Sequence, residues 1–295
     1  MIVFSPINTV RCTLGEGSVY DVRRNALWYC DIPARTVHRF ELTGGAVRQW
    51  TFPSEVGSLG IAGSGRLVIA LRHTVGLFDP ETGQFDEIAH IEMERGSETR
   101  LNDGKVGPDG AFWVGTMDDR GLAVREPLGA LYRVAGDGSV ERKVDGVMVS
   151  NGLAWTPDGR TMFHSDSSGR WLDRWDFDPA TGAMGNRTRI AVLDDATGRP
   201  DGGACDAEGY YWSAGVSAAR LNRIDRDGKI VASHPVPVAA PTMPCFGGPD
   251  LRTLFVTSLR TGRSPELLEK FPLTGITIMG ESPVAGAPVG LFADR

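Results

Sequence analysis

Residues 151–159 read NGLAWTPDG, and this stretch has counterparts along the whole chain. Five other segments align with it without gaps and keep its order of polar start, apolar middle and turn. They are 16–24 (EGSVYDVRR), 57–65 (GSLGIAGSG), 102–110 (NDGKVGPDG), 201–209 (DGGACDAEG) and 242–250 (TMPCFGGPD). Successive copies begin 41 to 50 residues apart, which is the period of a β-propeller blade.

Each copy leads into a short apolar run that is rich in aromatic and β-branched residues, as buried strands are. The runs are 26–30, 66–70, 111–115, 161–165, 210–214 and 253–257. A second hairpin follows, most clearly in the near-duplicates LFDPETG (77–83) and DFDPATG (176–182). Four strands in each of six copies predict an all-β, six-bladed β-propeller, with residues 1–295 as one domain. We expect Val3–Cys12 to complete the last blade and close the ring.

Bulk composition excludes several classes of partner. The chain has 295 residues, a net charge of −6 and no basic stripe, so nucleic acid is not an expected partner. No apolar run approaches the roughly 18 residues of a membrane span, and the N-terminus lacks the pattern of a signal peptide. The four cysteines are widely spaced, as in a reducing cytosol. We expect a cytoplasmic protein; the oligomeric state is not indicated.

The first strand of a propeller blade lines the central channel, so equivalent positions of the six copies converge on one axis. The residues at this position are Glu16, Gly57, Asn102, Asn151, Asp201 and Thr242. Asn or Asp before Gly is also common in turns, but four acidic or amide residues in register favour a shared site. Two carboxylates in a narrow channel repel each other unless a cation compensates them. A divalent ion with oxygen ligands is therefore expected at the axis.

Other catalytic chemistries have little support. The chain contains no GxSxG, HExxH or Walker motif, which argues against these serine hydrolase, zinc protease and nucleotide-binding classes. The five histidines do not share a position in the repeat. His164 is the one to follow, because it lies in an apolar run two residues from Asp166.

At these same residues the sequence resembles the SMP-30 family of gluconolactonases, regucalcin and luciferin-regenerating enzymes. The matching stretches are LGEG (14–17), RLNDGK (100–105), GTM (115–117), GALY (129–132), SNGL (150–153), PDG (200–202) and CFGG (245–248). They occur in order over nearly the whole chain.

The resemblance implies a role for each matching residue. Glu16, Asn151 and Asp201 are expected to bind the metal, and Asp201 also to act as the general base. Arg100 and Asn102 are expected to hold the sugar, with Asn102 close to the metal. The implied cofactor is one divalent cation, with Ca²⁺, Zn²⁺, Mn²⁺, Mg²⁺ and Fe²⁺ all open.

The loop 118–127 departs from the family pattern. Some relatives carry a substrate-binding glutamate where this chain has Arg120, with Asp119 next to it. We expect both residues at the substrate, and the departure leaves the identity of the sugar open. The implied reaction is hydrolysis of a sugar-acid lactone such as glucono-, xylono-, arabino- or galactonolactone. The alternatives are a phosphotriesterase-like hydrolase and a calcium-binding or interaction propeller without catalysis.

Overall fold

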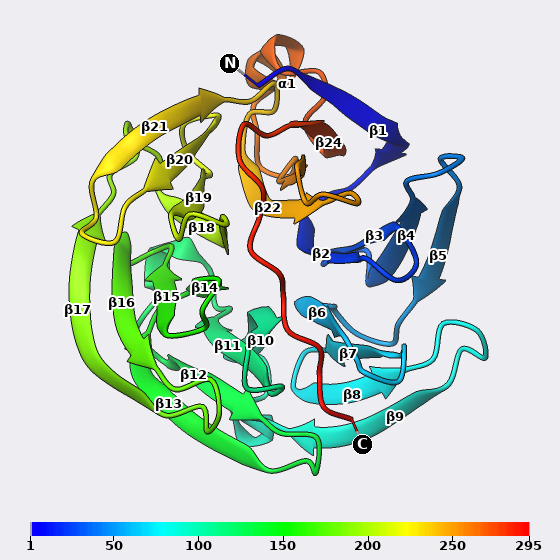
Figure 1. The fold of residues 1–295 in the computed structure, drawn as a ribbon, viewed down its shortest axis with the longest axis vertical. Helices are drawn as coiled ribbons and strands as arrows, with labels where there is room; N and C mark the ends of the chain where they lie inside the picture. The colour runs from blue at the N-terminus through cyan, green and yellow to red at the C-terminus, as the bar shows by residue number, and fades with distance from the viewer. Residues whose placement is uncertain (1, 295) are drawn as a thin grey trace.

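A computed structural model describes residues 2–294, which form six four-stranded antiparallel sheets around a central axis (Figure 1). The first sheet contains β2 (Gly15–Asp21), β3 (Ala26–Asp31), β4 (Thr36–Glu41) and β5 (Val47–Thr51). The second contains β6 (Ser58–Ile61), β7 (Leu67–Ala70), β8 (Thr74–Phe78) and β9 (Phe85–His90). The third contains β10 (Thr99–Val106), β11 (Phe112–Asp118), β12 (Gly129–Val134) and β13 (Val140–Val147).

The next two blades repeat this consecutive order, and the last one differs. The fourth contains β14 (Ser150–Trp155), β15 (Thr161–Asp166), β16 (Trp171–Phe177) and β17 (Met184–Val192). The fifth contains β18 (Pro200–Cys205), β19 (Tyr211–Gly215), β20 (Arg220–Ile224) and β21 (Ile230–Pro235). The sixth joins β22 (Pro241–Gly247), β23 (Thr253–Ser258) and β24 (Ile276–Glu281) to β1 (Phe4–Arg11).

The predicted six-bladed propeller is therefore confirmed, including the closure of its ring. The N-terminal strand β1 pairs with β24, so the last blade combines the two ends of the chain. This pairing ties the N-terminal segment to the last blade and closes the circle of sheets (Figure 1). The six apolar runs found in the sequence correspond to the second strands β3, β7, β11, β15, β19 and β23.

The hydrophobic core lies between neighbouring blades. Trp28 of the first blade packs with Leu59 and Phe78 of the second, and Trp113 of the third packs with Trp155 of the fourth. A blade can bury its faces only against its neighbours. Ring closure consequently gives every blade two partners and holds the inner strands at fixed distances from the axis.

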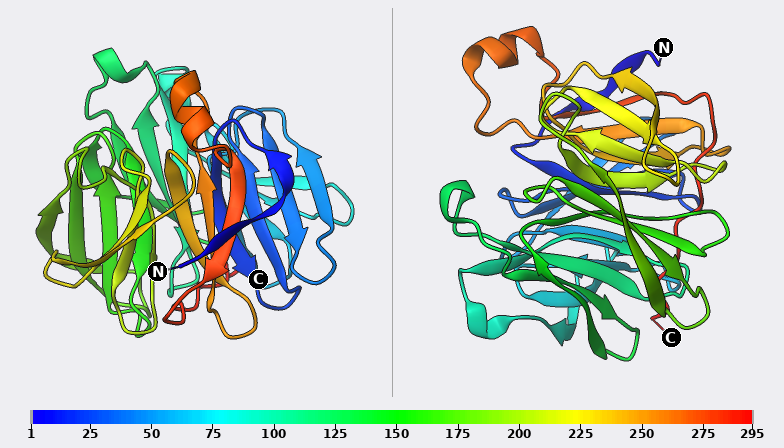
Figure 2. Two further views of the ribbon diagram at one scale, coloured as in Figure 1. Left: turned by 90° about the horizontal axis from the view of Figure 1, so that it is seen from above. Right: turned by 90° about the vertical axis from the view of Figure 1, so that its left-hand side faces the viewer.

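The two faces of the ring carry different segments (Figure 2). The helix α1 (Pro265–Lys270) projects from one face, as do the short helical turns η1 (Met93–Arg95) and η2 (Leu122–Val124). The C-terminal segment 282–294 crosses the opposite face over the axis, where Phe292 bridges to Ala62 and Gly286 to Asp206. Within residues 2–294, no helix is long and apolar enough to cross a membrane.

Candidate functional site

A cavity of about 250 Å³ opens at the end of the channel where the inner strands begin. Glu16, Asn102, Asn151 and Asp201 all line it, together with Arg100. The four acidic or amide residues that the repeat predicted at the axis thus share one site. The other two axial positions contribute no ligand side chain: Gly57 has none, and Thr242 donates its hydroxyl to the carbonyl of Gly15 at 2.5 Å.

Irregularities in the inner strands aim these side chains into the cavity. The pairing of β2 with β3 shifts register after Glu16, and the pairing of β14 with β15 shifts after Asn151. The strands that carry Asn102 and Asp201 have the same feature. An extra residue of this kind bends a strand and redirects its side chains. Gly17 and Gly152, with φ of 59° and 65°, supply the positive φ that the bend requires in two of the blades.

Three carboxylates influence one another at the centre of the site: Glu16 and Asp103 are buried, and Asp201 is partly buried. Burial, and then the charges of Asp201 and Asp103, raise the pKa of Glu16 well above its usual range. Burial and the charge of Asp103 raise the pKa of Asp201 to about 7. Burial also raises the pKa of Asp103. Burial and mutual repulsion make the charged form of each carboxylate unfavourable here. A cation bound among them would offset this repulsion, and the site should therefore attract one.

Asn151 offers a ligand atom that the protein itself does not use. Its amide nitrogen donates to Ser167 Oγ at 3.0 Å and to Asp201 Oδ1. Its Oδ1 is buried and has no hydrogen-bond partner. Buried polar atoms normally have partners, and an amide oxygen beside two carboxylates is a suitable ligand for a hard or borderline divalent ion. Glu16, Asn151 and Asp201 therefore fit the metal that the sequence implied.

This donor set contains two carboxylates and one amide rather than a cluster of acids and histidines. Residues 2–294 hold no group of three or more His, Cys, Asp or Glu side chains positioned to bind a metal ion. The ligand assignment and the metal itself remain predictions.

Arg100 and Asn102 form a connected pair at the cavity wall. Arg100 Nη1 donates to Asn102 Oδ1 at 3.0 Å, and Asn102 Nδ2 donates to the carbonyl of Ser150 at 2.9 Å. Arg100 Nε lies 3.3 Å from Asp119 Oδ1. The guanidinium thereby orients the amide, and Asp119 orients the guanidinium from outside the cavity lining.

Arg120 has a different environment from the other predicted substrate residues. Its guanidinium pairs with Asp118 and with Glu126, each at 2.8 Å, and it does not line the cavity. The buried Asp118 carboxylate also accepts the backbone N–H of Glu126. In this arrangement Arg120 holds the two ends of the loop 118–126 together, while Arg125 of the same loop reaches the cavity.

Sequence reasoning missed four residues of the site. Asp103 had a detectable signal, because the other copies carry Gly17, Ser58, Gly152, Gly202 and Met243 at that position and only this one has a charge. Arg125, Arg199 and Arg263 line the cavity from loops outside the repeated stretches. No spacing in the sequence relates these three arginines to one another.

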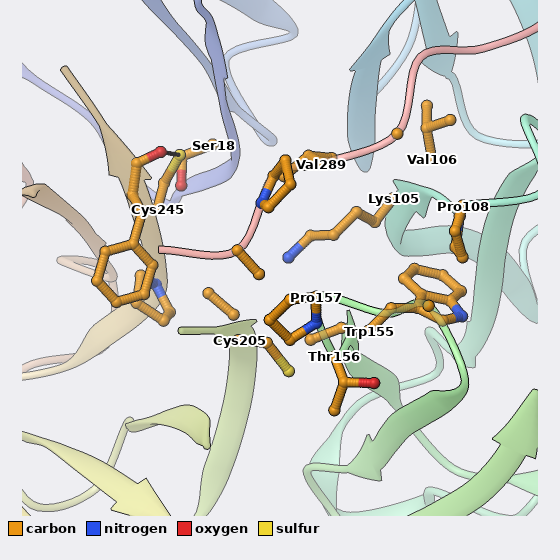
Figure 3. Close-up of a pocket in the computed structure, with 18 residues that line it drawn as sticks. Ser18, Lys105, Val106, Pro108, Trp155, Thr156, Pro157, Cys205, Cys245 and Val289 are labelled. Carbon is orange, nitrogen blue, oxygen red and sulfur yellow. Dashed lines mark hydrogen bonds between the residues drawn. The ribbon is translucent and has the colours of Figure 1, made fainter. Parts of the chain in front are cut away.

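A second cavity lies at the other end of the same strands, beneath the C-terminal segment (Figure 3). Its lining includes Cys205, Cys245 and Val289, with Lys105 reaching in (Figure 3). Lys105 Nζ donates to the carbonyl of Gly203 at 2.5 Å and ties β10 to β18. Burial lowers the pKa of Lys105, and the nearby Asp103 opposes that effect. From this second cavity, the positive charge of Lys105 partly balances the negative charge of Asp103.

His164, the histidine singled out in the sequence, lies outside the cavity lining. It is 0% exposed, and its Nε2 lies 2.8 Å from Ser150 Oγ. The Asp166 carboxylate accepts backbone N–H groups of the adjacent loops, including those of Met148 and Gly169. Both residues support the strand that carries Asn151.

Comparison with known proteins gives consistent matches over the length of the chain. Residues 14–260 match the family described as the SMP-30/gluconolactonase/LRE-like region. The chain is 37% identical over 285 residues to a 6-deoxy-6-sulfogluconolactonase of Pseudomonas putida, covering 95% of each chain. It is 33% identical to regucalcin of Gallus gallus, covering 94% of this chain and 96% of that protein. The crystal structure of a calcium-binding protein, regucalcin, from Agrobacterium tumefaciens superposes with a TM-score of 0.92 at 29% identity, covering 99% and 97% of the two chains.

Proposed function

Because the chain belongs to the SMP-30/gluconolactonase/LRE-like family, we propose that it hydrolyses a sugar lactone to the open sugar acid with one bound divalent cation. The observation that carries the proposal is the meeting of Glu16, Asn151 and Asp201 in one cavity with Arg100 and Asn102. The unpartnered, buried Oδ1 of Asn151 supports the presence of a cation.

Glu16, Asn151 and Asp201 would hold the cation, which when bound would polarise the lactone carbonyl and stabilise negative charge on its oxygen. Arg100 and Asn102 would position the sugar ring by hydrogen bonds, and such positioning lowers the entropic part of the barrier. The apolar lining, which includes Leu14, Val149 and Leu259, would limit the access of bulk water.

Asp201 is the base in this scheme. Its carboxylate takes a proton from the attacking water as the new C–O bond forms at the carbonyl carbon. It then returns the proton to the ring oxygen as the ester C–O bond breaks, so that one water is consumed and a sugar acid is released. Burial raises the pKa of Asp201 in the absence of a cation, and a bound cation would oppose this shift and keep the carboxylate in the charged form that a base requires.

The test is a lactone hydrolysis assay with a pH indicator. The protein is stripped with a chelator, reloaded separately with Ca²⁺, Mg²⁺, Mn²⁺, Zn²⁺ or Fe²⁺, and given a panel of five- and six-carbon aldonolactones. We expect no turnover of the stripped protein and recovery with at least one ion. Full activity after complete metal removal contradicts the cation's role, and no turnover with any ion or lactone contradicts the function.

Asp201→Asn separates the base from the ligand, because the amide keeps an oxygen for the cation. We expect kcat to fall by more than about 10²-fold while the bound cation remains measurable. Asp227→Asn is the matched control, since that carboxylate is 80% exposed and lies between β20 and β21, outside the cavity lining. Near-normal turnover of Asp201→Asn would assign the proton transfer to another group.

A further inference from the structure

The lining of the site cavity contains more positive charge than the proposed hydrolysis uses. Arg100, Arg125, Arg199 and Arg263 face only two lining carboxylates, Glu16 and Asp201. The proposed cation would balance those two carboxylates. Arg100 is paired with Asp119. Arg125, Arg199 and Arg263 have no role in the proposed hydrolysis.

Arg263 shows the clearest need for a partner. Its Nε is buried and has no hydrogen-bond partner within residues 2–294. A buried N–H group without an acceptor costs free energy, and a charged group costs more. A ligand oxygen in the cavity would supply the missing acceptor.

Arg199 and Arg125 also lack a close carboxylate. The nearest for Arg199 is Asp195 at 4.0 Å, and Asp195 already pairs with Arg170 at 2.8 Å. Arg125 donates to the carbonyl of Asp118 at 3.1 Å and to Ser168 Oγ at 2.9 Å, both of which are uncharged. The charge of Arg199 lowers the pKa of Asp201, but neither guanidinium forms a close ion pair, so both can donate to an anion in the cavity.

The three arginines come from three different blades. Arg125 follows η2 in the third, Arg199 precedes β18 in the fifth, and Arg263 precedes α1 in the sixth. All three belong to loops, whereas Glu16 and Asn151 lie on the inner strands at the axis. A substrate whose carbonyl lies at the axis would extend its other end toward the loops.

We propose that Arg125, Arg199 and Arg263 bind an anionic group at the end of the substrate remote from the lactone carbonyl. The inference rests on the proposed lactone hydrolysis and narrows its substrate to lactones of sugar acids with a second acidic group. Guanidinium groups donate paired, charge-assisted hydrogen bonds to sulfonate, carboxylate and phosphate oxygens alike. All three anions accept the same hydrogen bonds, and the experiment compares them with one another.

The test measures kcat/KM of the metal-loaded protein on matched lactones. Glucono-1,5-lactone is compared with analogues that carry sulfonate, carboxylate or phosphate at C6. At least one anionic analogue should exceed the neutral lactone by about 10-fold or more, mainly through a lower KM, because hydrogen bonds to charged groups contribute on that scale. In Arg263→Met the ratio of anionic to neutral kcat/KM should fall by about 10- to 100-fold.

Two further variants make the outcome decisive. Arg263→Lys should keep part of the anion preference, because it keeps the charge but not the guanidinium geometry. Arg48→Met, at a 46% exposed arginine on the outer strand β5, should leave the ratio unchanged. Equal or better turnover of the neutral lactone by the wild type overturns the inference and leaves lactone hydrolysis intact. An equal loss on all lactones in Arg263→Met overturns it too, and no turnover of any lactone overturns both proposals.

Discussion

Replacing His164 by glutamine removes a titratable side chain that the fold keeps fully buried. His164 is 0% exposed, and its ring meets Trp171 edge-on with 5.5 Å between the ring centroids. Burial lowers the pKa of His164 to about 3, against about 6.5 in an unfolded chain. The folded protein therefore excludes a proton that the unfolded chain binds.

The sign and size of the effect follow from proton linkage. Because the pKa in the folded state is below that in the unfolded state, the stability from this group is complete above about pH 6.5 and is lost as the pH falls toward about 3. Between pH 7 and pH 5 only the unfolded chain takes up the proton. The free energy of unfolding should fall by about 2 kcal/mol from His164 alone over that range.

The assay is urea-induced unfolding at pH 7 and pH 5, in chelator, for the wild type, His164→Gln and His90→Gln. Between the two pH values the free energy of unfolding should fall by about 2 kcal/mol more in the wild type than in His164→Gln. The contributions of all other titrating groups are the same in both proteins and cancel in this difference. His90→Gln is the matched control, since that side chain is 51% exposed. If His164→Gln loses as much stability as the wild type, the burial argument for His164 is refuted.

Three further changes test other parts of the structure. Glu16→Gln removes one of the buried carboxylates that repel each other. Without the cation, the free energy of unfolding at pH 8 should rise by about 1 kcal/mol, and the affinity for the cation should fall at least about 10-fold. Thermal unfolding with and without the ion measures both effects. Arg120→Ala removes the ion pairs to Asp118 and Glu126; amide exchange in 119–126 should accelerate and the lactone KM should rise, whereas Arg120→Lys should change both less. Gly57→Ala would place a Cβ 2.6 Å from the carbonyl oxygen of Leu101, which should cost about 2 kcal/mol by overpacking. Calorimetry measures this loss of stability. Gly185→Ala is the control and should cause no such loss, because a Cβ there meets nothing within 4 Å.

The axial residues could be predicted because they repeat. Glu16, Asn102, Asn151 and Asp201 occupy one position in copies of a single sequence pattern, and a closed ring brings that position to one axis. The same logic could have found Asp103, the charged residue at a position where the other copies have small or apolar ones. Gly57 occupies the same position without a side chain, because a Cβ there would lie 2.6 Å from the carbonyl oxygen of Leu101 and 2.8 Å from that of Asn102.

The loop residues could not be predicted in this way. Asp119 and Arg120 are adjacent in the sequence, yet Asp119 accepts from Arg100 beside the cavity while Arg120 pairs with Asp118 and Glu126 within the loop. Which neighbour each side chain faces depends on the path of the loop and not on any periodicity.

The sequence by itself determined the propeller, its six blades and the acidic axis, because strand patterning and blade period are local properties that recur every 41 to 50 residues. Only the tertiary structure decided the charge of the cavity's rim. Arg125, Arg199 and Arg263 are separated by more than 60 residues in each interval and share no motif. They meet because ring closure places loops of the third, fifth and sixth blades over the same opening.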